Sequence, residues 1–335
     1  MFIDGNTRLV GIIGHPLGHT LSPTIHNAAF DYMGLNWFYV PLLVQPGSLP
    51  AAIDGIRALG LAGVNVTMPF KTEVLPLLDE VAMFAESVGA INTILLYKGK
   101  LIGYNTDGRG FYTALVRDLG FEVKGRKILV LGAGGASRSV TVSLALAGCA
   151  SIIIVNRSPE RSEQLADIIH RSAPEVDVTL FSPDDYYDLV VADSDVIINA
   201  TPLTTFSCSA LRIPVAMLNK NQLVCDLNYS LYQPPLLQEA EARGAQVMDG
   251  KGMLLYQAAA AFEIWTGLEA PVEVMRVALI KALEEARIYE CRFSTVTGRL
   301  RGHAFSGHGT TTGQSRGSCV VALILASVRG SITKG

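Results

Sequence analysis

The sequence predicts an α/β protein with two open, mainly parallel sheets, each in its own domain. Three observations lead to this prediction. Strand-like and helix-like segments alternate along most of the chain, which is typical of parallel sheets flanked by helices. The 335 residues suffice for two domains of ordinary size, and the 49% of hydrophobic residues suffice for their cores. A second series of such segments starts near residue 126, and its first strand leads into a glycine-rich turn.

The first series alternates strands and helices before it closes with a hairpin. Strands are expected at 8–14, 36–44 and 62–67, helices at 23–34, 48–60 and 71–89, and the hairpin at 90–106 with its turn at 98–100. The first helix is expected to end at Gly34 and to bury one face. That face comprises Ile25, Ala28, Ala29, Tyr32 and Met33.

The second series starts near residue 126 with "RKILVLG", an apolar run expected where both faces of a strand are covered. Strands are expected at 126–132, 151–156, 176–181, 194–201, 222–229 and 245–250. Helices are expected at 133–148, 159–172, 234–244, 252–267 and 271–289. Six strands with helices between them fit a doubly wound dinucleotide-binding fold.

The string "VLGAGGASR" follows a strand and opens a helix, the context in which such a motif indicates dinucleotide binding. Gly132 would make the tight turn, and Gly134 and Gly135 would let backbone N–H groups approach a pyrophosphate at the helix N-terminus. Ser137 occupies the third position of the fingerprint, where Gly or Ala is usual, so the motif is a variant. A plain strand-to-helix turn is the alternative interpretation.

The end of the next strand indicates which dinucleotide is bound. An NAD site places a carboxylate there for the ribose 2′-hydroxyl, whereas this strand ends at Asn156 and is followed by Arg157 and Arg161. Guanidinium groups bind phosphate in a bidentate manner, so the pattern predicts NADP. A solvated pair of arginines at the start of a helix is the alternative.

Lys71 and Asp107 are the residues best suited to acid/base chemistry. Each follows a predicted strand and precedes a predicted helix, and ligands of open α/β sheets bind at the carboxyl ends of strands. If both side chains face one crevice, the aspartate would orient the ammonium group for proton transfer. Surface solvation, and helix capping by Asp107, are the alternatives that the sequence leaves open.

Composition excludes several other classes of function. The net charge of −3 and the absence of long basic runs argue against nucleic-acid binding. The five cysteines are scattered without a CxxC pair, so we expect small, reduced hydrophobic residues and no metal site. No signal peptide or bilayer-spanning run is evident, and we expect a cytoplasmic protein without membrane contact.

Several of these strings together resemble one family. "GHPLGHTLSPTIHN", "GVNVTMPFK", "VGAINT", "GYNTDGRGF", "LGAGGASR", "NRSPER" and "GMLLYQAAAAFEIW" occur in the order of the shikimate dehydrogenase family, over about residues 8–285. The resemblance implies an N-terminal substrate-binding domain (1–110 plus 252–288) and a Rossmann-like NADP-binding domain (111–251). It also implies NADPH-dependent, reversible reduction of 3-dehydroshikimate to shikimate, a step of aromatic amino-acid synthesis. Residues 289–335 have no counterpart in the family pattern, and we expect an atypical, poorly ordered tail.

The resemblance implies roles for individual residues. Lys71 and Asp107 fall on the catalytic pair, and Thr20 and Ser22 on the two hydroxyls that hold the substrate carboxylate. Further substrate contacts fall on Thr67, Asn92, Tyr229 and Gln257. Cofactor positions fall on Gly132, Ala133, Gly134, Gly135, Ala136, Asn156, Arg157, Ser158 and Arg161. The family usually has Ser where Thr20 stands and His where Phe70 stands, so position 70 does not carry an essential base.

The stretch "GHTLSPTIHN" therefore looks like an anion cradle, with Ser22 capping a helix whose first residue is Pro23. The extra methyl group of Thr20 keeps a quinate/shikimate dehydrogenase, using NAD or NADP, as the nearest alternative. A non-catalytic nucleotide-binding module is a more remote one. We expect a small-molecule substrate as the partner, and the sequence leaves a homodimer open.

Overall fold

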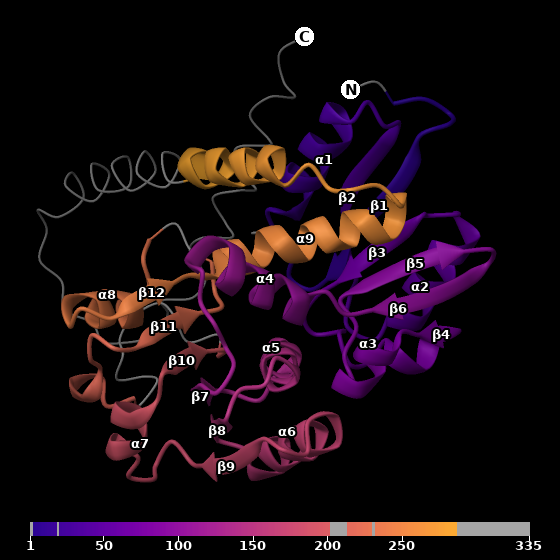
Figure 1. The fold of residues 1–335 in the computed structure, drawn as a ribbon. Helices are drawn as coiled ribbons and strands as arrows, with labels where there is room; N and C mark the ends of the chain where they lie inside the picture. The colour runs from indigo at the N-terminus through magenta and orange to yellow at the C-terminus, as the bar shows by residue number, and fades with distance from the viewer. Residues whose placement is uncertain (1–2, 19, 202–212, 230–231, 287–335) are drawn as a thin grey trace, which may run out of the picture. The chain divides into compact units, whose positions relative to one another are not determined.

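The computed structural model describes residues 3–18, 20–201, 213–229 and 232–286, whose strands form two six-stranded sheets within one compact unit (Figure 1). The predicted tail at 289–335 lies outside the described residues. The prediction of two α/β domains with open sheets is confirmed. Within the described part of the chain, no helix has the length and apolar character needed to cross a bilayer.

The first sheet has the strand order β2-β1-β3-β5-β6-β4. Its strands are β1 Arg8–Gly14, β2 Trp37–Leu43, β3 Gly63–Val66, β4 Glu80–Val81, β5 Thr93–Tyr97 and β6 Lys100–Tyr104. Strand β1 pairs in parallel with β2 and β3, and β4 pairs in parallel with β6. Strand β5 runs antiparallel to both β3 and β6. The β5–β6 hairpin turns through Lys98 and Gly99, both at positive φ, as predicted.

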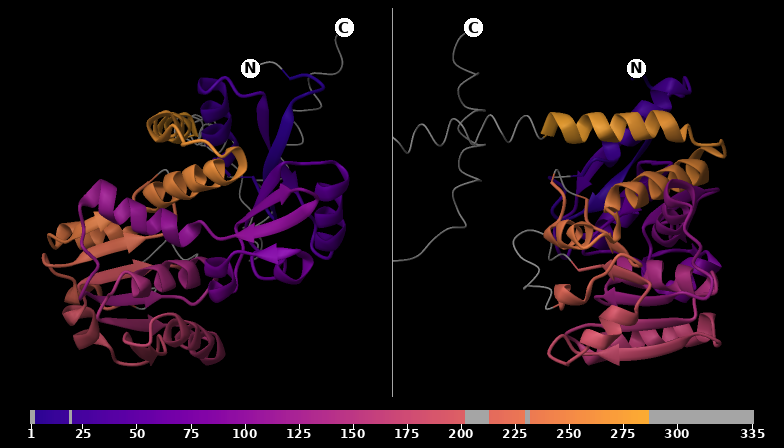
Figure 2. Two further views of the ribbon diagram at one scale, coloured as in Figure 1. Left: turned by 45° about the vertical axis from the view of Figure 1, so that its right-hand side comes forward. Right: turned by 60° about the vertical axis from the view of Figure 1, so that its left-hand side comes forward.

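Helices cover both faces of this sheet. One face packs against α1 (Ser22–Tyr32), α9 (Gly250–Thr266) and the helical residues 272–286, which lie together in Figure 2. The other face packs against α2 (Leu49–Ala58), the 3-10 turn η1 (Leu75–Leu77) and α3 (Met83–Val88).

Two predictions about this domain were wrong in detail. The face of α1 that is buried comprises Ser22, Ile25, His26, Ala29 and Phe30, whereas Tyr32 is 68% exposed. The buried row follows the i, i+3, i+4 spacing from Ser22, and Tyr32 lies off that row.

The region 71–89 is not one helix but a turn, η1, the short strand β4 and α3. Long-range contacts decide this, because β4 pairs with β6 and Asp79 accepts hydrogen bonds from Leu101 N at 2.6 Å and from Arg57 at 2.9 Å.

The second sheet is parallel throughout, in the order β12-β11-β10-β7-β8-β9. Its strands are β7 Lys127–Leu131, β8 Ser151–Val155, β9 Asp177–Phe181, β10 Val196–Asn199, β11 Leu223–Asp226 and β12 Gln246–Met248. The chain builds outward from β7 to β9 and then returns to β10 on the other side of β7. This reversal is the topological switch point at which doubly wound folds bind ligands.

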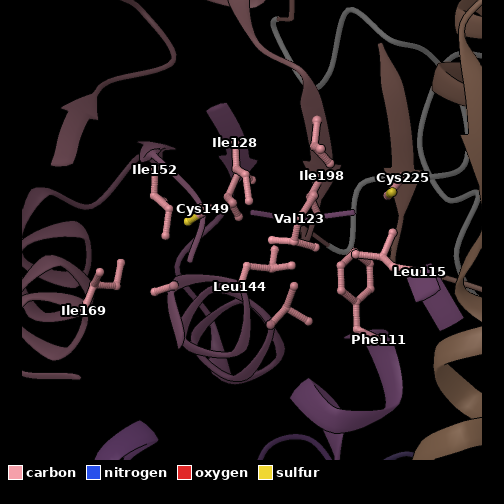
Figure 3. Close-up of a cluster of buried hydrophobic side chains, with 14 of the residues drawn as sticks. Phe111, Leu115, Val123, Ile128, Leu144, Cys149, Ile152, Ile169, Ile198 and Cys225 are labelled. Carbon is pink, nitrogen blue, oxygen red and sulfur yellow. The ribbon is translucent and has the colours of Figure 1, made fainter. Parts of the chain in front are cut away.

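The helices of this sheet again form two layers. Its α-helices are α4 Asp107–Leu119, α5 Gly135–Leu146, α6 Pro159–Ser172, α7 Asp188–Asp193 and α8 Pro235–Ala242, with the 3-10 turn η3 at Val215–Met217. Figure 3 shows Ile128, Ile152 and Ile198 of the strands packing toward Leu144 of α5, with Phe111 of α4 beside them. The opposite face packs against α7, η3 and α8.

Two cysteines belong to the same core. Cys149 and Cys225 are free and buried in the cluster that Figure 3 shows. Burial raises the pKa of the Cys149 thiol to about 11, so it stays protonated. Both therefore behave as the small hydrophobic residues that the sequence predicts.

Candidate active site

A cavity of about 290 Å³ contains the residues that sequence reasoning assigned to catalysis and substrate binding. Its walls include Thr20, Ser22, Thr67, Lys71, Asn92, Asp107, Tyr229 and Gln257. They come from segments spread over more than two hundred residues of sequence, and the fold brings all of them together. The size and the mixture of polar and apolar walls suit a small polar molecule.

Lys71 and Asp107 form the ion pair at the centre of this cavity. The Lys71 ammonium nitrogen lies 2.5 Å from Asp107 Oδ2, and the two side chains are 21% and 6% exposed. Asp107 is the first residue of α4, as predicted, whereas Lys71 lies in a turn after β3 and does not begin a helix. Ile91 N donates to Lys71 O at 2.7 Å, so the backbone of this turn is held by the chain that enters β5.

Asn92 connects the ion pair to its surroundings. Its Nδ2 donates to Asp107 Oδ1 at 2.8 Å and lies 3.4 Å from Gln257 Oε1. Its Oδ1 accepts from Thr106 N at 2.8 Å. Both carboxylate oxygens of Asp107 are thus engaged, one by Asn92 and the other by Lys71. This arrangement fixes the direction from which Asp107 holds the ammonium group.

Gln257 reaches Asn92, which donates to Asp107, because α9 packs very closely against α4. The two helices lie side by side in Figure 1, and Gly110 is at their contact. A Cβ at position 110 would lie 2.7 Å from Gln257 N and 2.8 Å from Met253 O. Only a glycine allows this approach, so Gly110 positions Gln257, which lies 147 residues further along the chain.

The two hydroxyls of the expected anion cradle lie at the cavity wall, but not as predicted in detail. Helix α1 begins at Ser22, its N-cap is Leu21, and no side chain caps it. Leu21 already has helical backbone angles (φ −97°, ψ −4°), so the prediction of Ser22 as N-cap was wrong by one residue. Thr20 Oγ1 instead accepts from Ser22 N at 3.4 Å. The hydroxyl of Ser22, a buried residue, is therefore not used as a cap.

The glycine-rich turn has the form that a pyrophosphate requires. Gly132 has φ +103°, which favours glycine, and Gly134 precedes α5 as an N-cap without a side chain. A Cβ on Gly134 would meet nothing within 4 Å, so space for a ligand adjoins the backbone. Ser137 is fully buried and donates to Gly132 O at 2.6 Å, which explains a serine at the third fingerprint position.

This turn also adjoins Lys71 and the cavity. A Cβ on Gly135 would lie 3.7 Å from Lys71 Cδ, and Ala136 lines the cavity. Ala133, by contrast, is buried within the core of the second sheet. The residues present therefore fit a dinucleotide bound at the glycine-rich turn, next to the cavity.

The predicted 2′-phosphate residues cluster where β8 meets α6. Ser158 is the N-cap of α6 and accepts from Arg161 N, and Asn156 Nδ2 donates to Ser158 O at 2.9 Å. Arg157 and Arg161 are exposed, and within the described residues neither forms an ion pair with an acid. Two unpaired guanidinium groups at a helix N-terminus suit a phosphate.

Sequence reasoning missed other residues of the site. Asn65 lines the cavity from the middle of β3, and a polar residue inside the apolar run "GVNVT" is the signal that could have found it. Arg138 of α5 donates to Gln164 of α6 at 2.9 Å, and burial together with the charge of Arg161 lowers its pKa.

A further missed group supports Tyr229. Asp226 is 1% exposed and accepts from Asn199 Nδ2 at 2.9 Å and from Asn228 N at 2.9 Å. Burial raises its pKa, and the two amides oppose that effect. The network joins the carboxyl ends of β10 and β11, directly before Tyr229 enters the cavity wall.

No cluster of three or more His, Cys, Asp or Glu that could hold a metal occurs among the residues described.

Comparison with known proteins gives consistent matches. Residues 12–94 match the shikimate dehydrogenase substrate-binding domain, 114–229 match the family described as shikimate/quinate 5-dehydrogenase, and 250–280 match the shikimate 5′-dehydrogenase C-terminal domain. The NADP(+) shikimate dehydrogenase of Desulforamulus reducens is 44% identical over 281 residues, which cover 83% of this chain and 97% of the relative.

Solved structures agree. A shikimate dehydrogenase in complex with NADP+ is 41% identical, covers 84% of this chain and 98% of its own, and has a TM-score of 0.76. Shikimate 5-dehydrogenase from Listeria monocytogenes, in complex with shikimate and NAD, is 37% identical with a TM-score of 0.77, covering 83% and 98% of the two chains.

Proposed function

Because the chain belongs to the shikimate dehydrogenase family, we propose that its cavity binds 3-dehydroshikimate or shikimate and that Lys71 is the general acid and base of their interconversion. The chain is an NADP-dependent oxidoreductase of the shikimate pathway, which leads to the aromatic amino acids. The observation that carries the proposed mechanism is the contact between Lys71 and Asp107 inside the cavity, beside the glycine-rich turn.

The proposed chemistry follows from the charge that develops during reduction. NADPH, when bound, supplies the hydride that reaches the carbonyl carbon. Negative charge then grows on the carbonyl oxygen, where the Lys71 ammonium group stabilises it and donates the proton that completes the hydroxyl. Asp107 keeps the ammonium group in place through the 2.5 Å contact. In the oxidative direction, neutral Lys71 accepts the hydroxyl proton.

The remaining cavity residues orient the substrate. We propose that Thr20 and Ser22 bind the carboxylate, and that Thr67, Asn92, Tyr229 and Gln257 contact the ring and its hydroxyl groups. Asn92 supports this division because it donates to Asp107, and Gln257 supports it because it lies beside Asn92. Orientation of this kind matters for rate, because a bound substrate held in one geometry reacts as in an intramolecular step.

For the cofactor, we propose that the backbone from Gly132 to Ala136 holds the pyrophosphate, and that Asn156, Arg157, Ser158 and Arg161 bind the 2′-phosphate. The open space above Gly134 and the unpaired guanidinium groups support this assignment. We also propose the domain division into 1–110 plus 252–288 and 111–251, supported by the separate cores of the two sheets.

One assay tests the proposed function. Formation of reduced cofactor is followed with shikimate or quinate, each with NADP+ or NAD+. We expect shikimate with NADP+ to be the preferred combination. A preference for quinate would favour the quinate/shikimate alternative, which the extra methyl group of Thr20 makes worth testing. No turnover in any of the four combinations would contradict an active enzyme of this family.

Two further expectations are proposals of the same kind. We propose that the protein acts in the cytoplasm, which the free thiols of Cys149 and Cys225 support, since cytosolic cysteines are kept reduced. Fractionation of the source cells tests this. A homodimer stays a prediction, and sedimentation velocity of the full chain would show a species of either one or two chain masses.

A further inference from the structure

Tyr39 of β2 is a buried phenol that sequence reasoning did not single out. It is 1% exposed and lies directly behind the wall of the cavity. We propose that Tyr39 is a positioning residue for the carboxylate end of the substrate and that it acts through Asn65. This inference rests on the proposed function, because it takes Thr20 and Ser22 as the carboxylate site.

The hydroxyl of Tyr39 fixes one end of the Asn65 amide. Tyr39 OH donates to Asn65 Oδ1 at 2.8 Å, while Asn65 Nδ2 donates to Thr93 Oγ1 at 3.0 Å and to Asn92 O at 3.1 Å. Asn65 is 4% exposed and lines the cavity. Every polar atom of its side chain is thus engaged, so the amide cannot rotate without leaving a buried group unpaired.

Tyr39 also adjoins the carboxylate cradle. Burial raises its pKa well above 10, and the hydroxyl of Ser22 beside it has the opposite, smaller effect. The charge of ionised Tyr229 would raise the pKa of the same phenol further. The phenol therefore lies among Ser22, Asn65 and Tyr229, all of which line the cavity. Because the Tyr39 hydroxyl donates to Asn65, it is free to accept a hydrogen bond from the Ser22 hydroxyl.

The motif "SPTIHN" holds Tyr39 in place. Strand β2 lies at the edge of its sheet, so one side of its backbone has no neighbouring strand. There the Asn27 side chain pairs with the backbone of Tyr39 instead. Tyr39 N donates to Asn27 Oδ1 at 2.8 Å, and Asn27 Nδ2 donates to Tyr39 O at 3.0 Å. The ring of His26 stacks on the Tyr39 ring with centroids 4.6 Å apart and planes 3° apart.

His26 contributes an uncharged, flat surface. Both of its ring nitrogens are buried without a hydrogen-bond partner among the described residues, and burial lowers its pKa to about 3. The first six residues of α1 thus supply Ser22, one of the two hydroxyls of the proposed carboxylate site, and the two residues that hold Tyr39 behind it, His26 and Asn27. This explains why a histidine without a catalytic role belongs to the same short stretch as the substrate hydroxyls.

The test measures recognition of the carboxylate separately from overall activity. The full-length enzyme oxidises shikimate or its methyl ester with NADP+, and the ratio of the two kcat/KM values reports how well the negative carboxylate is recognised. We expect Tyr39→Phe to lower this ratio about tenfold, with the KM for NADP+ unchanged. The fold-change corresponds to loss of about one buried hydrogen bond.

Tyr256→Phe is the matched control. Its hydroxyl donates to Asp118 at 2.7 Å, outside the cavity, so it loses a comparable bond without touching the carboxylate end. We expect its ratio to equal that of the wild type. If Tyr39 has only a structural role, both substrates lose activity equally in Tyr39→Phe, and that result overturns the inference.

Two more variants separate the possible failures. Ser22→Ala must lower the ratio, and if it does not, the proposed carboxylate site itself is wrong. If Ser22→Ala lowers the ratio and Tyr39→Phe does not, only the inference about Tyr39 is wrong. In an Asn65→Ala background, Tyr39→Phe should cause no further decrease in the ratio, because the side chain through which Tyr39 acts is already absent. An additive decrease would overturn the route through Asn65. Should Tyr39→Phe not fold, an unchanged ratio in Asn65→Ala alone overturns the inference.

Discussion

The Lys71 ammonium nitrogen and Asp107 Oδ2 lie 2.5 Å apart, in a chain where 36 positions separate the two residues. Lys71 follows β3 and Asp107 begins α4 after β6, so the pair connects two strand ends of the first sheet. Asn92 and the glycine-rich turn adjoin the same pair. The proposed acid and base, the two side chains that hold its ammonium group in place and the glycine-rich turn thus meet at one point.

Replacement of Lys71 by alanine should abolish most of the turnover. We expect kcat to fall by about 10²–10⁴, with a smaller change in the KM for shikimate, because the lysine acts most strongly on charge that develops in the transition state. Steady-state kinetics with NADP+ measure both quantities. Lys100→Ala is the control, since Lys100 forms an exposed ion pair with Glu80. Turnover near that of the wild type in Lys71→Ala would remove Lys71 from the mechanism.

Loss of the Ser22 hydroxyl should weaken substrate binding more than chemistry. We expect Ser22→Ala to raise the KM for shikimate about tenfold, the effect of one hydrogen bond to a charged group. Ser87→Ala is a matched control because Ser87 is exposed and its hydroxyl, among the residues that the structure describes, bonds only to Phe84 O. An unchanged KM in Ser22→Ala would count against the carboxylate site.

Arg157→Ala should reduce the preference for NADP over NAD. A guanidinium–phosphate contact contributes about 1.5–3 kcal/mol, so we expect the KM for NADP+ to rise roughly ten- to a hundredfold. The KM for NAD+ should change little, because NAD lacks the 2′-phosphate. Arg171→Ala serves as the control, because Arg171 lies in the last turn of α6, the helix that follows Arg157. Equal losses with both cofactors would contradict 2′-phosphate recognition by Arg157.

Acid should destabilise the fold through His26. The pKa of His26 is about 3 in the folded protein and about 6.5 when unfolded, so between these values the unfolded chain takes up a proton that the folded chain does not. Stability is therefore present in full above pH 6.5 and is lost as the pH falls toward 3, at no more than about 1.4 kcal/mol per pH unit.

Urea unfolding at pH 7, 6 and 5 measures this slope. His26→Phe keeps a flat ring against Tyr39 and removes the titrating group, so its free energy of unfolding should fall less steeply with acid than that of the wild type. Identical slopes in the two proteins would show that His26 does not titrate on unfolding.

Gly110→Ala should damage both stability and catalysis. The new Cβ would lie 2.7 Å from Gln257 N, so α9 must move away from α4 and carry Gln257 with it. We expect a loss of about 1–3 kcal/mol in the free energy of unfolding and a lower kcat/KM for shikimate. In Gly55→Ala, a Cβ in α2 would meet nothing within 4 Å, so this control should gain about 0.4–1 kcal/mol with unchanged kinetics. Wild-type kinetics in Gly110→Ala would show that Gln257 tolerates the shift.

Local patterns predicted the parts of the fold that depend on neighbouring residues. The turn at Lys98 and Gly99, the six strands of the second sheet and the start of α5 after the glycine-rich turn were all predicted correctly. Region 71–89 was predicted wrongly, because its short strand β4 forms only by pairing with β6, and Asp79 is held by Arg57 and Leu101. Helical spacing within the segment contains no information on such partners.

The sequence by itself determined the α/β class, the glycine-rich turn, the arginines after β8 and the residues able to do acid/base chemistry, because periodicity, backbone freedom and side-chain chemistry are local properties. Only the tertiary structure decided that Lys71 meets Asp107, that Gln257 reaches Asn92 where α9 packs on Gly110, and that Tyr39 lies behind Asn65. These contacts join strands and helices far apart in the chain, and the packing of the sheets and helices brings them together. The stretch "SPTIHN" shows both sides. The sequence singled out Ser22 as a candidate for substrate binding, whereas the contacts of His26 and Asn27 with Tyr39 depend on a strand that α1 covers.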